Sequence, residues 1–538
     1  MKNEKAGSGR GNFPRIPVVD LFAGPGGLGE GFSSVRDGQG NSRFDVRISI
    51  EKDAVAHRTL RLRAMFRCFG KRVPDSYYDY IRGTISWDEF RSANRPEYEQ
   101  AHAEARQATL GETSEASVDS WIRDAIGTAS RWVLIGGPPC QAYSLAGRSR
   151  RKNVDAENFA NDARHLLYRE YLRIIAKFRP PIFVMENVKG ILSSKHEGAG
   201  IFQKILADLS KPHPDLEYSI RSFAVDGDAE SLLPSQYVLE AEKYGIPQAR
   251  HRVILLGVRK DLADLQHHAL PTKPQVSVID AIGSLPRLRS RLSKEPDSHE
   301  AWLKAIKESQ KILKDCPRPI RDALKIEMSA AYVKALETTR IGGQFIQRSN
   351  LSFKKMPDPL AAWLRDTRVG GVCQHESRSH MRSDLRRYMF ASCFARAQGW
   401  SPKLADYPGD LLPDHENVSS ESTPFGDRFR VQLGSMPSTT VVSHISKDGH
   451  YYIHPDPSQC RSLTVREAAR LQTFPDNYFF EGPRTEQYTQ VGNAVPPLLA
   501  RQLGKVVFNL LKQWDERDSE RRTHSPAAKR AQSIAVVA

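Results

Sequence analysis

The sequence of 538 residues lacks the features that mark several common classes of protein. It has no uninterrupted apolar run long enough to span a bilayer, which argues against a membrane protein. Residues 1–11 are polar and do not resemble a secretory signal, so we expect a cytoplasmic protein. Cysteine is scarce, with six residues and no close pair such as C-x-x-C, so neither a zinc site nor a disulfide framework is expected.

Acidic residues are also in deficit. The chain has 63 Asp and Glu against 79 Lys and Arg, a formal charge of +16, which favours a polyanionic partner. The hydrophobic fraction of 39% is enough for real cores, and the length predicts two or more domains.

Short apolar strands alternate with helical patterns through the first half of the chain. The expected strands are 16–22, 46–51, 132–135, 182–185 and 253–258, with a helix at 166–178. This alternation predicts an α/β fold, with a mostly parallel, Rossmann-like sheet covered on both faces and a second, smaller domain. The expected boundaries are a first domain at 14–260 with a polar insertion at 61–130, a second region at 261–435, a C-terminal section at 436–515, and disordered tails at 1–13 and 516–538.

The C-terminal section contains two helix signals. Thr464 and Glu467 have the spacing of a capping box, which opens a helix through Gln472. A second helix is expected from Pro497 to Trp514.

A glycine-rich turn directly follows the first strand. Gly24, Gly26 and Gly29 match G-x-G-x-x-G, and Glu51 closes the next strand at the distance expected of a carboxylate that binds ribose hydroxyls. The pattern favours an adenosine-containing cofactor. It leaves open a nicotinamide or flavin dinucleotide, or a glycine turn that serves packing alone.

Cys140 differs from the other cysteines because it lies in a loop beyond a strand end, after Gly-Gly-Pro-Pro. Ligands of open α/β sheets bind at such ends, so we interpret Cys140 as a nucleophile. Glu186 ends the next strand, where a buried carboxylate must be paired or functional. Arg250 and Arg252 point the same way if their segment is extended. Each of these charged residues taken alone could equally be part of a surface ion pair.

Together these elements resemble the DNA cytosine-5 methyltransferase family, in its bacterial modification-enzyme form. The motifs occur in the family's order: Asp20 to Gly29, Glu51, Gly136 to Ser144, Glu186-Asn187-Val188, Gln248-x-Arg250-x-Arg252, Arg466 to Pro475, and Gln490 to Pro496. They cover roughly 18–259 and 437–507.

The resemblance implies a mechanism and a set of site residues. Cys140 would attack a flipped-out cytosine, Glu186 would contact ring N3, and Arg252 with Arg250 would hold the carbonyl oxygen. S-adenosyl-L-methionine would be the methyl donor. Its predicted contacts are Phe22, Gly24, Gly26, Gly27, Leu28, Glu51, Pro138 and Asn493, and Asn493 would bring the C-terminal helix back onto the first domain.

The same resemblance assigns target recognition to the region after the arginine motif. Residues 260–430 hold 28 basic and 21 acidic residues. The predicted DNA contacts are Arg148, Arg150, Arg151 and Lys152 on a closing loop, and Arg378, Arg382, Arg386 and Arg387 near His375 and His380. For any one of them, a solvated charge or a phosphate contact competes with base recognition.

The chain departs from the family at the third strand. The segment expected there, Arg82 to Ile85, lacks the acidic residue that would contact adenine. Three alternatives remain: a transfer-RNA methyltransferase, a nicotinamide-dependent oxidoreductase and a silent DNA-binding regulator. The family implies double-stranded DNA as partner, a monomer on DNA, no metal, and restriction–modification or phage defence with any nuclease on a separate chain.

Overall fold

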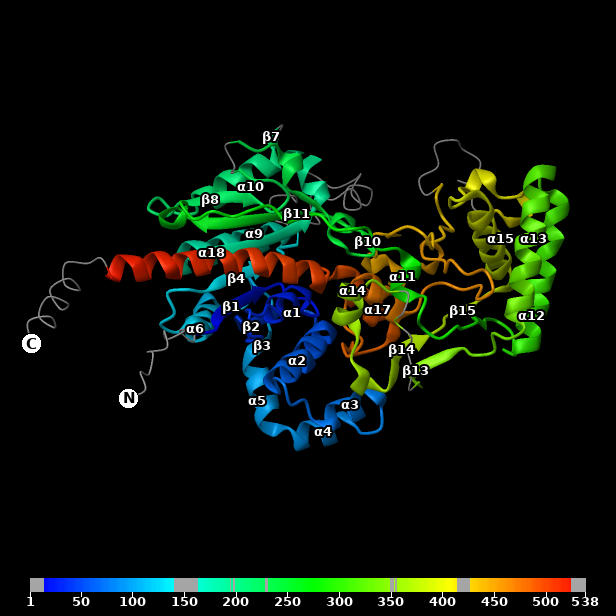
Figure 1. Cartoon of the computed structure of the whole chain (residues 1–538), viewed down its shortest axis with the longest axis horizontal. Coiled ribbons are helices and arrows are strands. Elements are labelled where there is room, and N and C mark those ends of the chain that lie inside the picture. The colour runs from blue at the N-terminus through cyan, green and yellow to red at the C-terminus, as the bar shows by residue number, and fades with distance from the viewer. Residues whose placement is uncertain are drawn as a thin grey trace, which may run out of the picture.

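The computed structural model describes residues 14–139, 163–193, 195–196, 199–227, 231–348, 353, 356–413 and 426–523. It has a sheet with its covering helices at one end, a group of helices at the other, and a helical insertion beside them (Figure 1). None of the described helices combines the length and apolar character needed to cross a membrane.

An eight-stranded sheet forms the centre of the first part. Its strands run in the order β3 (Ala105–Gln107), β2 (Phe44–Glu51), β1 (Ile16–Leu21), β4 (Val133–Gly136), β5 (Ile182–Val188), β11 (His251–Arg259) and β8 (Tyr218–Ser222), while β9 (Val238–Glu240) pairs beside β11. The first five strands are mutually parallel, and β11 runs antiparallel to both its neighbours. The predicted α/β class and mostly parallel sheet are therefore confirmed.

Helices cover both faces of this sheet. On one face α1 (Gly27–Ser33) and α18 (Pro497–Thr523) bury Leu28, Phe32 and Leu503 against alternate strand residues. On the other face lie α6 (Glu115–Ile126), α9 (Ala163–Phe178) and α10 (Ile201–Ser210). The C-terminal helix does return to the first domain, because α18 packs directly on α1 (Figure 1).

The polar insertion is helical, with α2 (Ala54–Cys68), α3 (Asp75–Arg82), α4 (Trp87–Ala93) and α5 (Arg95–Glu104). We expected the third strand at Arg82 to Ile85, and this was wrong. Tyr77, Tyr78 and Ile81 instead bury one side of α3, which ends at Gly83 with a φ of 80°. The strand that pairs with β2 comes later, as β3, and sets Gln107 opposite Glu51.

The second region has a helical core of its own. That core contains α12 (His299–Glu308), α13 (Arg318–Ala335) and α15 (Arg382–Gln398). The helices α11 (Val278–Ile282) and α14 (Asp358–Leu364) of the same region pack instead with helices of the C-terminal section. Short strand pairs complete the fold: β13 (Gly342–Gln347) with β14 (Gly371–Glu376), β12 (Arg291–Leu292) with β15 (Ser379–His380), β10 (Gln248–Ala249) with β16 (Ser438–Thr439), and β6 (Lys195–His196) with β7 (Ala199–Gly200). The insertion contacts this region, since the Tyr78 hydroxyl donates to Asp366 at 2.8 Å.

The C-terminal section begins with α16 (Val465–Leu471), whose predicted capping box is present. The next helix is α17 (Arg484–Asn493), and α18 then continues to Thr523, beyond the boundary expected at Glu516. Ion pairs explain the extra turns: Arg131 contacts Asp515 and Asp518, and Arg517 contacts Asp264. The predicted tail beyond Thr523 and the tail at 1–13 lie outside the described residues.

Candidate active site

The carboxyl ends of β1, β2, β4 and β5 meet at one edge of the sheet because these strands are parallel neighbours. The loop from Phe22 to Gly26, Glu51, the segment Gly136–Pro138, and Glu186 all lie at or just beyond this edge. Open α/β sheets bind their ligands at this end of the strands. The topology alone therefore gathers the predicted cofactor residues beside the predicted catalytic carboxylate.

The glycine turn and Glu51 are joined by backbone hydrogen bonds. The amides of Gly24 and Asp53 donate to the two Glu51 carboxylate oxygens at 2.8 and 2.7 Å. Burial raises the pKa of Glu51, although these two N–H donors act against that shift. Phe22 and Gly24 both have a φ of 58°, so the turn uses left-handed backbone.

The side of the turn at Gly27 is closed by the chain's C-terminal section. A Cβ at Gly27 would lie 2.3 Å from the Val495 carbonyl oxygen, so only glycine fits there. Asn493 is exposed at the end of α17, two residues before Val495, while Leu28 is buried in α1. Val495 therefore lies against the turn, and the role of Asn493, two residues earlier, stays a prediction.

Glu186 forms an ion pair with Arg252, with 2.9 Å between Oε1 and Nε. The antiparallel pairing of β5 and β11 produces this contact, since it sets Val188 opposite Arg252. Their side chains are 15% and 14% exposed, so the pair is sheltered yet open at one side. A Cβ at Gly137 would lie 2.9 Å from Glu186 Oε2, so the loop that leads to position 140 passes beside the carboxylate.

Pro138 lies in the described part of that loop, and its carbonyl accepts a hydrogen bond from Asn187 Nδ2 at 3.2 Å. Cys140 and the predicted DNA contacts Arg148, Arg150, Arg151 and Lys152 lie outside the described residues.

Arg250 occupies a different environment from Arg252. It is 2% exposed, and its Nη1 donates to the carbonyls of Val441 at 2.9 Å and Gly492 at 3.2 Å. Burial, with the nearby charge of Arg252, lowers the pKa of Arg250 well below its ordinary value. The sequence grouped the two arginines as contacts of one carbonyl oxygen, but the structure directs Arg250 to backbone acceptors.

Three of the four arginines predicted to contact DNA in the second region are engaged within the protein. Arg382 pairs with Glu295 at 2.8 Å, Arg387 Nε donates to the Leu411 carbonyl at 2.7 Å, and Arg378 lies over the Tyr488 ring. Arg386 differs, because its Nε is buried and has no hydrogen-bond partner among the described residues.

The two histidines near these arginines are buried as well. His375 bridges Thr464 Oγ1 and the Pro286 carbonyl, and His380 contacts Ser462. Spacing alone did not reveal these contacts, because each joins segments far apart in the sequence.

Two buried glutamines that the sequence analysis did not single out connect this edge to the C-terminal section. Gln248 Nε2 donates to Gln472 Oε1 at 2.9 Å, and Gln472 Nε2 donates to the Val491 carbonyl at 2.7 Å. Both residues belong to motifs quoted above. The sequence shows that these residues are present, but it does not show that they contact each other.

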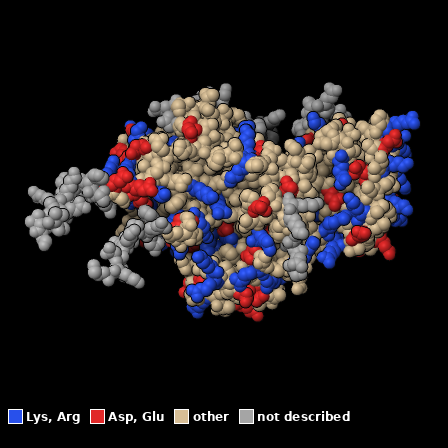
Figure 2. All heavy atoms as spheres, viewed as in Figure 1, with Lys and Arg blue, Asp and Glu red and all other residues tan. Residues whose placement is uncertain are grey.

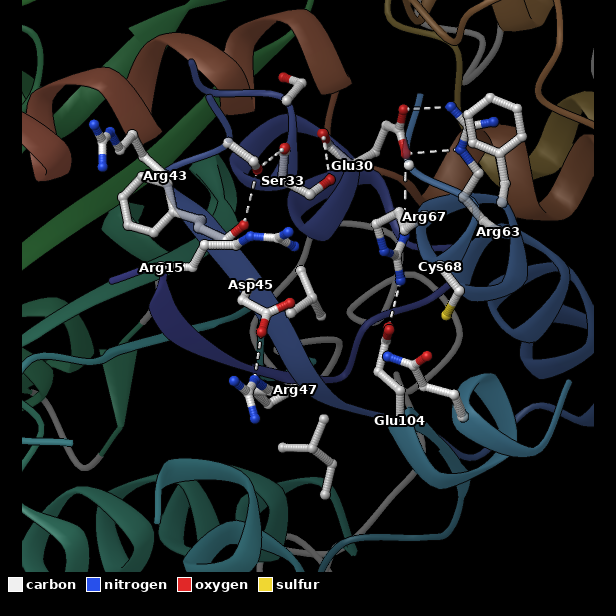
Figure 3. A pocket seen from close by; sticks show the side chains of 18 of the residues that line it. Arg15, Glu30, Ser33, Arg43, Asp45, Arg47, Arg63, Arg67, Cys68 and Glu104 are labelled. Carbon is white, nitrogen blue, oxygen red and sulfur yellow. Dashed lines mark hydrogen bonds and ion pairs between the residues drawn. The ribbon is translucent and has the colours of Figure 1, made fainter. Parts of the chain in front are cut away.

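A hollow of about 1120 Å³ lies along the first half of β2, between that strand and helices α1, α2 and α5 (Figure 3). Its lining includes Arg15 and Arg43, which precede β1 and β2. Several of its arginines are already paired: Arg63 with Glu30, Arg67 with Glu104, Arg43 with Asp37 and Arg47 with Asp45. We therefore place no cofactor there, and the carboxyl edge remains the candidate site.

Comparison with known proteins identifies the family. The model of the C-5 cytosine-specific DNA methylase family matches residues 97–509. The type II methyltransferase M.Bpa9945I of Bacillus paralicheniformis is 32% identical over 92% of this chain and 99% of its own length. The DNA (cytosine-5-)-methyltransferase M.ApeKI of Aeropyrum pernix is 25% identical over 92% of this chain and 99% of its own. The solved Entamoeba histolytica methyltransferase EhMeth is 12% identical with a TM-score of 0.44, covering 93% of this chain and 99% of its own.

An α/β sheet with a glycine turn and buried carboxylates at its carboxyl edge is typical of enzymes that bind an adenosine-containing cofactor. The chain belongs to the C-5 cytosine-specific DNA methylase family. It is a DNA (cytosine-5-)-methyltransferase.

Proposed function

We propose that this enzyme methylates carbon 5 of a cytosine flipped out of a specific duplex sequence, with S-adenosyl-L-methionine as donor. The observation that carries the proposal is the Glu186–Arg252 pair beside Gly137, three residues before Cys140 and on the same sheet edge as the glycine turn. The nicotinamide-dependent alternative rests on the glycine turn alone and does not explain this pair, whereas cytosine chemistry needs an acid and a cation at neighbouring ring positions.

The residues of the edge fit the methyl donor. A Cβ at Gly24 would meet nothing within 4 Å, so the backbone there faces open space that a ligand can enter. Glu51, held by two amides, would take the ribose hydroxyls. Phe22, Gly26, Gly27, Leu28, Pro138 and Asn493 would complete the site. The bound donor would supply an electrophilic methyl group.

The protein's own residues would make carbon 5 nucleophilic. The Cys140 thiolate would add to carbon 6, forming a sulfur–carbon bond. Glu186 would hydrogen-bond ring N3, and Arg252 would orient Glu186 while it holds the cytosine carbonyl oxygen. After methyl transfer, loss of the carbon 5 proton and breakage of the sulfur–carbon bond would release the base and restore the thiolate. The base is inaccessible within a duplex, so it must first be flipped.

The second region would recognise the target sequence. The enzyme would bind DNA as a monomer. Basic side chains gather along the outer edge of this region, over α12 and α13, which suits a polyanionic partner (Figure 2). The charged run Arg148, Arg150, Arg151 and Lys152 would close on phosphates. Because the relatives are named type II methyltransferases, we assign the enzyme to restriction–modification or phage defence in the cytoplasm, with any nuclease on another chain.

Covalent trapping tests the mechanism. Duplex DNA with 5-fluorocytosine at the target should form a denaturation-resistant adduct with the enzyme and S-adenosylmethionine, since its carbon 5 carries no removable proton. Cys140→Ala should abolish both the adduct and methylation while DNA binding survives. Cys68→Ala is the matched control and should retain the adduct, because burial raises the pKa of Cys68 to about 12. Methylation by Cys140→Ala would contradict the mechanism.

Bisulfite sequencing of DNA from cells that express the protein would give activity and target together. We expect one short sequence to be methylated. Methylation of transfer RNA with none of duplex DNA would instead support the RNA alternative, against which the long recognition region argues.

A further inference from the structure

The C-terminal end of α17 is held by side chains from other parts of the chain. The last carbonyls of a helix have no partner within it and need donors from elsewhere. Here Gln472 Nε2 lies 2.7 Å from the Val491 oxygen and 3.3 Å from the Ala494 oxygen. Arg250 Nη1 lies 3.2 Å from the Gly492 oxygen. A cation at this end also complements the helix dipole.

Arg250, with Gln248 two residues before it, also binds the segment that leads out of the second region. Arg250 Nη1 also donates to the Val441 carbonyl at 2.9 Å, and the Val441 amide donates to Gln248 Oε1 at 2.8 Å. A Cβ at Gly492 would lie 2.3 Å from the Ser443 amide nitrogen. These contacts therefore hold the segment 441–443 tightly against the C-terminal end of α17.

The segment that follows α17 lies against the glycine turn of the cofactor edge. Val495 packs on Gly27, two residues after the exposed Asn493. Arg250 has no such opening to the site, since it is 2% exposed and its Nη1 already meets two acceptors. Any shift of Gly492 would move the residues that close over the glycine turn.

We propose that Arg250 is a positioning residue for the methyl donor: with Gln472 it sets the 492–495 segment against Gly27, and it does not hold the cytosine. This inference rests on the proposed use of S-adenosylmethionine at this edge. It separates two arginines of one motif, since Arg252 acts on the base through Glu186 and Arg250 acts on the donor through the backbone.

Steady-state kinetics with Arg250→Met and Arg252→Met test the separation. Arg250→Met should raise KM for S-adenosylmethionine about 10- to 100-fold, the loss expected for hydrogen bonds from a charged group. Its kcat at saturating donor should stay within about threefold of the parent, because the groups that act on the base are intact. Arg252→Met should lower kcat and leave KM for the donor nearly unchanged. Arg250→Lys should restore part of the affinity, since an ammonium can donate to both carbonyls.

Two further variants keep the test decisive if Arg250→Met folds poorly. Gln472→Glu retains the size but turns the donor toward Val491 and Ala494 into an acceptor, and it should raise KM in the same way. Arg221→Met is the matched control, because Arg221 is a buried arginine that also donates to two carbonyls, those of Leu265 and Ala263, away from the edge. It should lose thermal stability without a change in KM.

Two results would overturn the inference. One is an Arg250→Met variant that loses kcat as Arg252→Met does with KM for the donor unchanged. The other is an Arg250→Met variant that loses only stability, as the Arg221→Met control does. A parent enzyme that binds no S-adenosylmethionine in calorimetry would refute the proposed function itself.

Discussion

The cofactor edge and the second region use charged residues in opposite ways. At the edge, Glu51 accepts two backbone amides at the end of β2, and the partly exposed Glu186 pairs with Arg252 near the end of β5. In the second region, Arg378, Arg382 and Arg387 are occupied by contacts within the protein. The first set lies where strand ends meet, whereas an arginine on a helix can serve packing as readily as binding.

The difference has a topological cause. A residue at the carboxyl end of a parallel strand reaches the ligand edge wherever that strand lies in the sheet. A residue on α15 faces solvent, core or partner according to how α12 and α13 pack on it, and that packing depends on distant segments. Site residues on the sheet can therefore be predicted from local sequence, and those on the helices cannot.

The largest expected effect is that of a substitution at Glu186, at the cofactor edge. Glu186→Gln keeps the size of the side chain but removes the acid and the charge that holds Arg252. We expect kcat to fall about 10²- to 10⁴-fold, the range for loss of a general acid or base, with little change in KM for the donor. Single-turnover methylation of duplex DNA measures the effect. Glu99→Gln, an exposed carboxylate paired with Arg95, is the control, and a Glu186→Gln variant of near-normal rate would remove Glu186 from the mechanism.

The sequence predicted the sheet well because its strands are short, apolar and bounded by turns. The strands at 16–22, 132–135 and 182–185 appear within a few residues of their expected limits. The third strand failed because β3 has only three residues and carries Arg106 and Gln107, so no apolar run announces it. The extra turns of α18 depend on ion pairs with Arg131, a partner that local sequence cannot reveal.

Within the site, the same rule separates what was predicted from what was missed. The pair of Glu186 and Arg252 follows from two strand ends, and both residues were named. The buried role of Arg250 depends on Val441 and Gly492, which lie 191 and 242 positions away. Spacing within a motif shows that two arginines can share a direction, but it does not show what surrounds them.

A second prediction compares two buried carboxylates by the pH dependence of stability. Burial raises the pKa of Asp20, on β1, to about 8, although Arg67 and the Gly29 amide oppose the shift. Folded Asp20 thus keeps its proton between about pH 4 and 8 while the unfolded chain has lost it. Its contribution to stability is full below pH 4 and falls as pH rises to 8, by up to about 1.4 kcal/mol per unit.

Asp20→Asn should therefore gain stability relative to the parent as pH rises from 4 to 8, and the gain should level off above 8, as followed by urea denaturation. Glu467→Gln provides the opposite sign. Burial alone would raise the pKa of Glu467. The charge and hydrogen bonds of Arg461 have the larger effect, so the pKa lies well below its ordinary value. The cost of Glu467→Gln should be present at neutral pH and shrink in acid. Parallel profiles for the two variants would contradict the assignment.

The smallest expected effect concerns the arginines of α15. It tests whether the contacts within the protein that occupy Arg382 keep this side chain from binding DNA. Arg386→Gln removes the charge whose Nε has no hydrogen-bond partner among the described residues, and it should weaken duplex binding by less than about tenfold. It should also reduce the slope of log affinity against log salt by about 1, the value for one lost phosphate contact.

Arg382→Gln is the control, on the same helix. It removes an ion pair with Glu295 and should change only thermal stability, and only slightly. Fluorescence anisotropy over a salt series distinguishes the two. If Arg382→Gln lowers the salt slope and Arg386→Gln does not, the ion pair with Glu295 opens on DNA, and the contrast between the two regions would then hold only for the free enzyme.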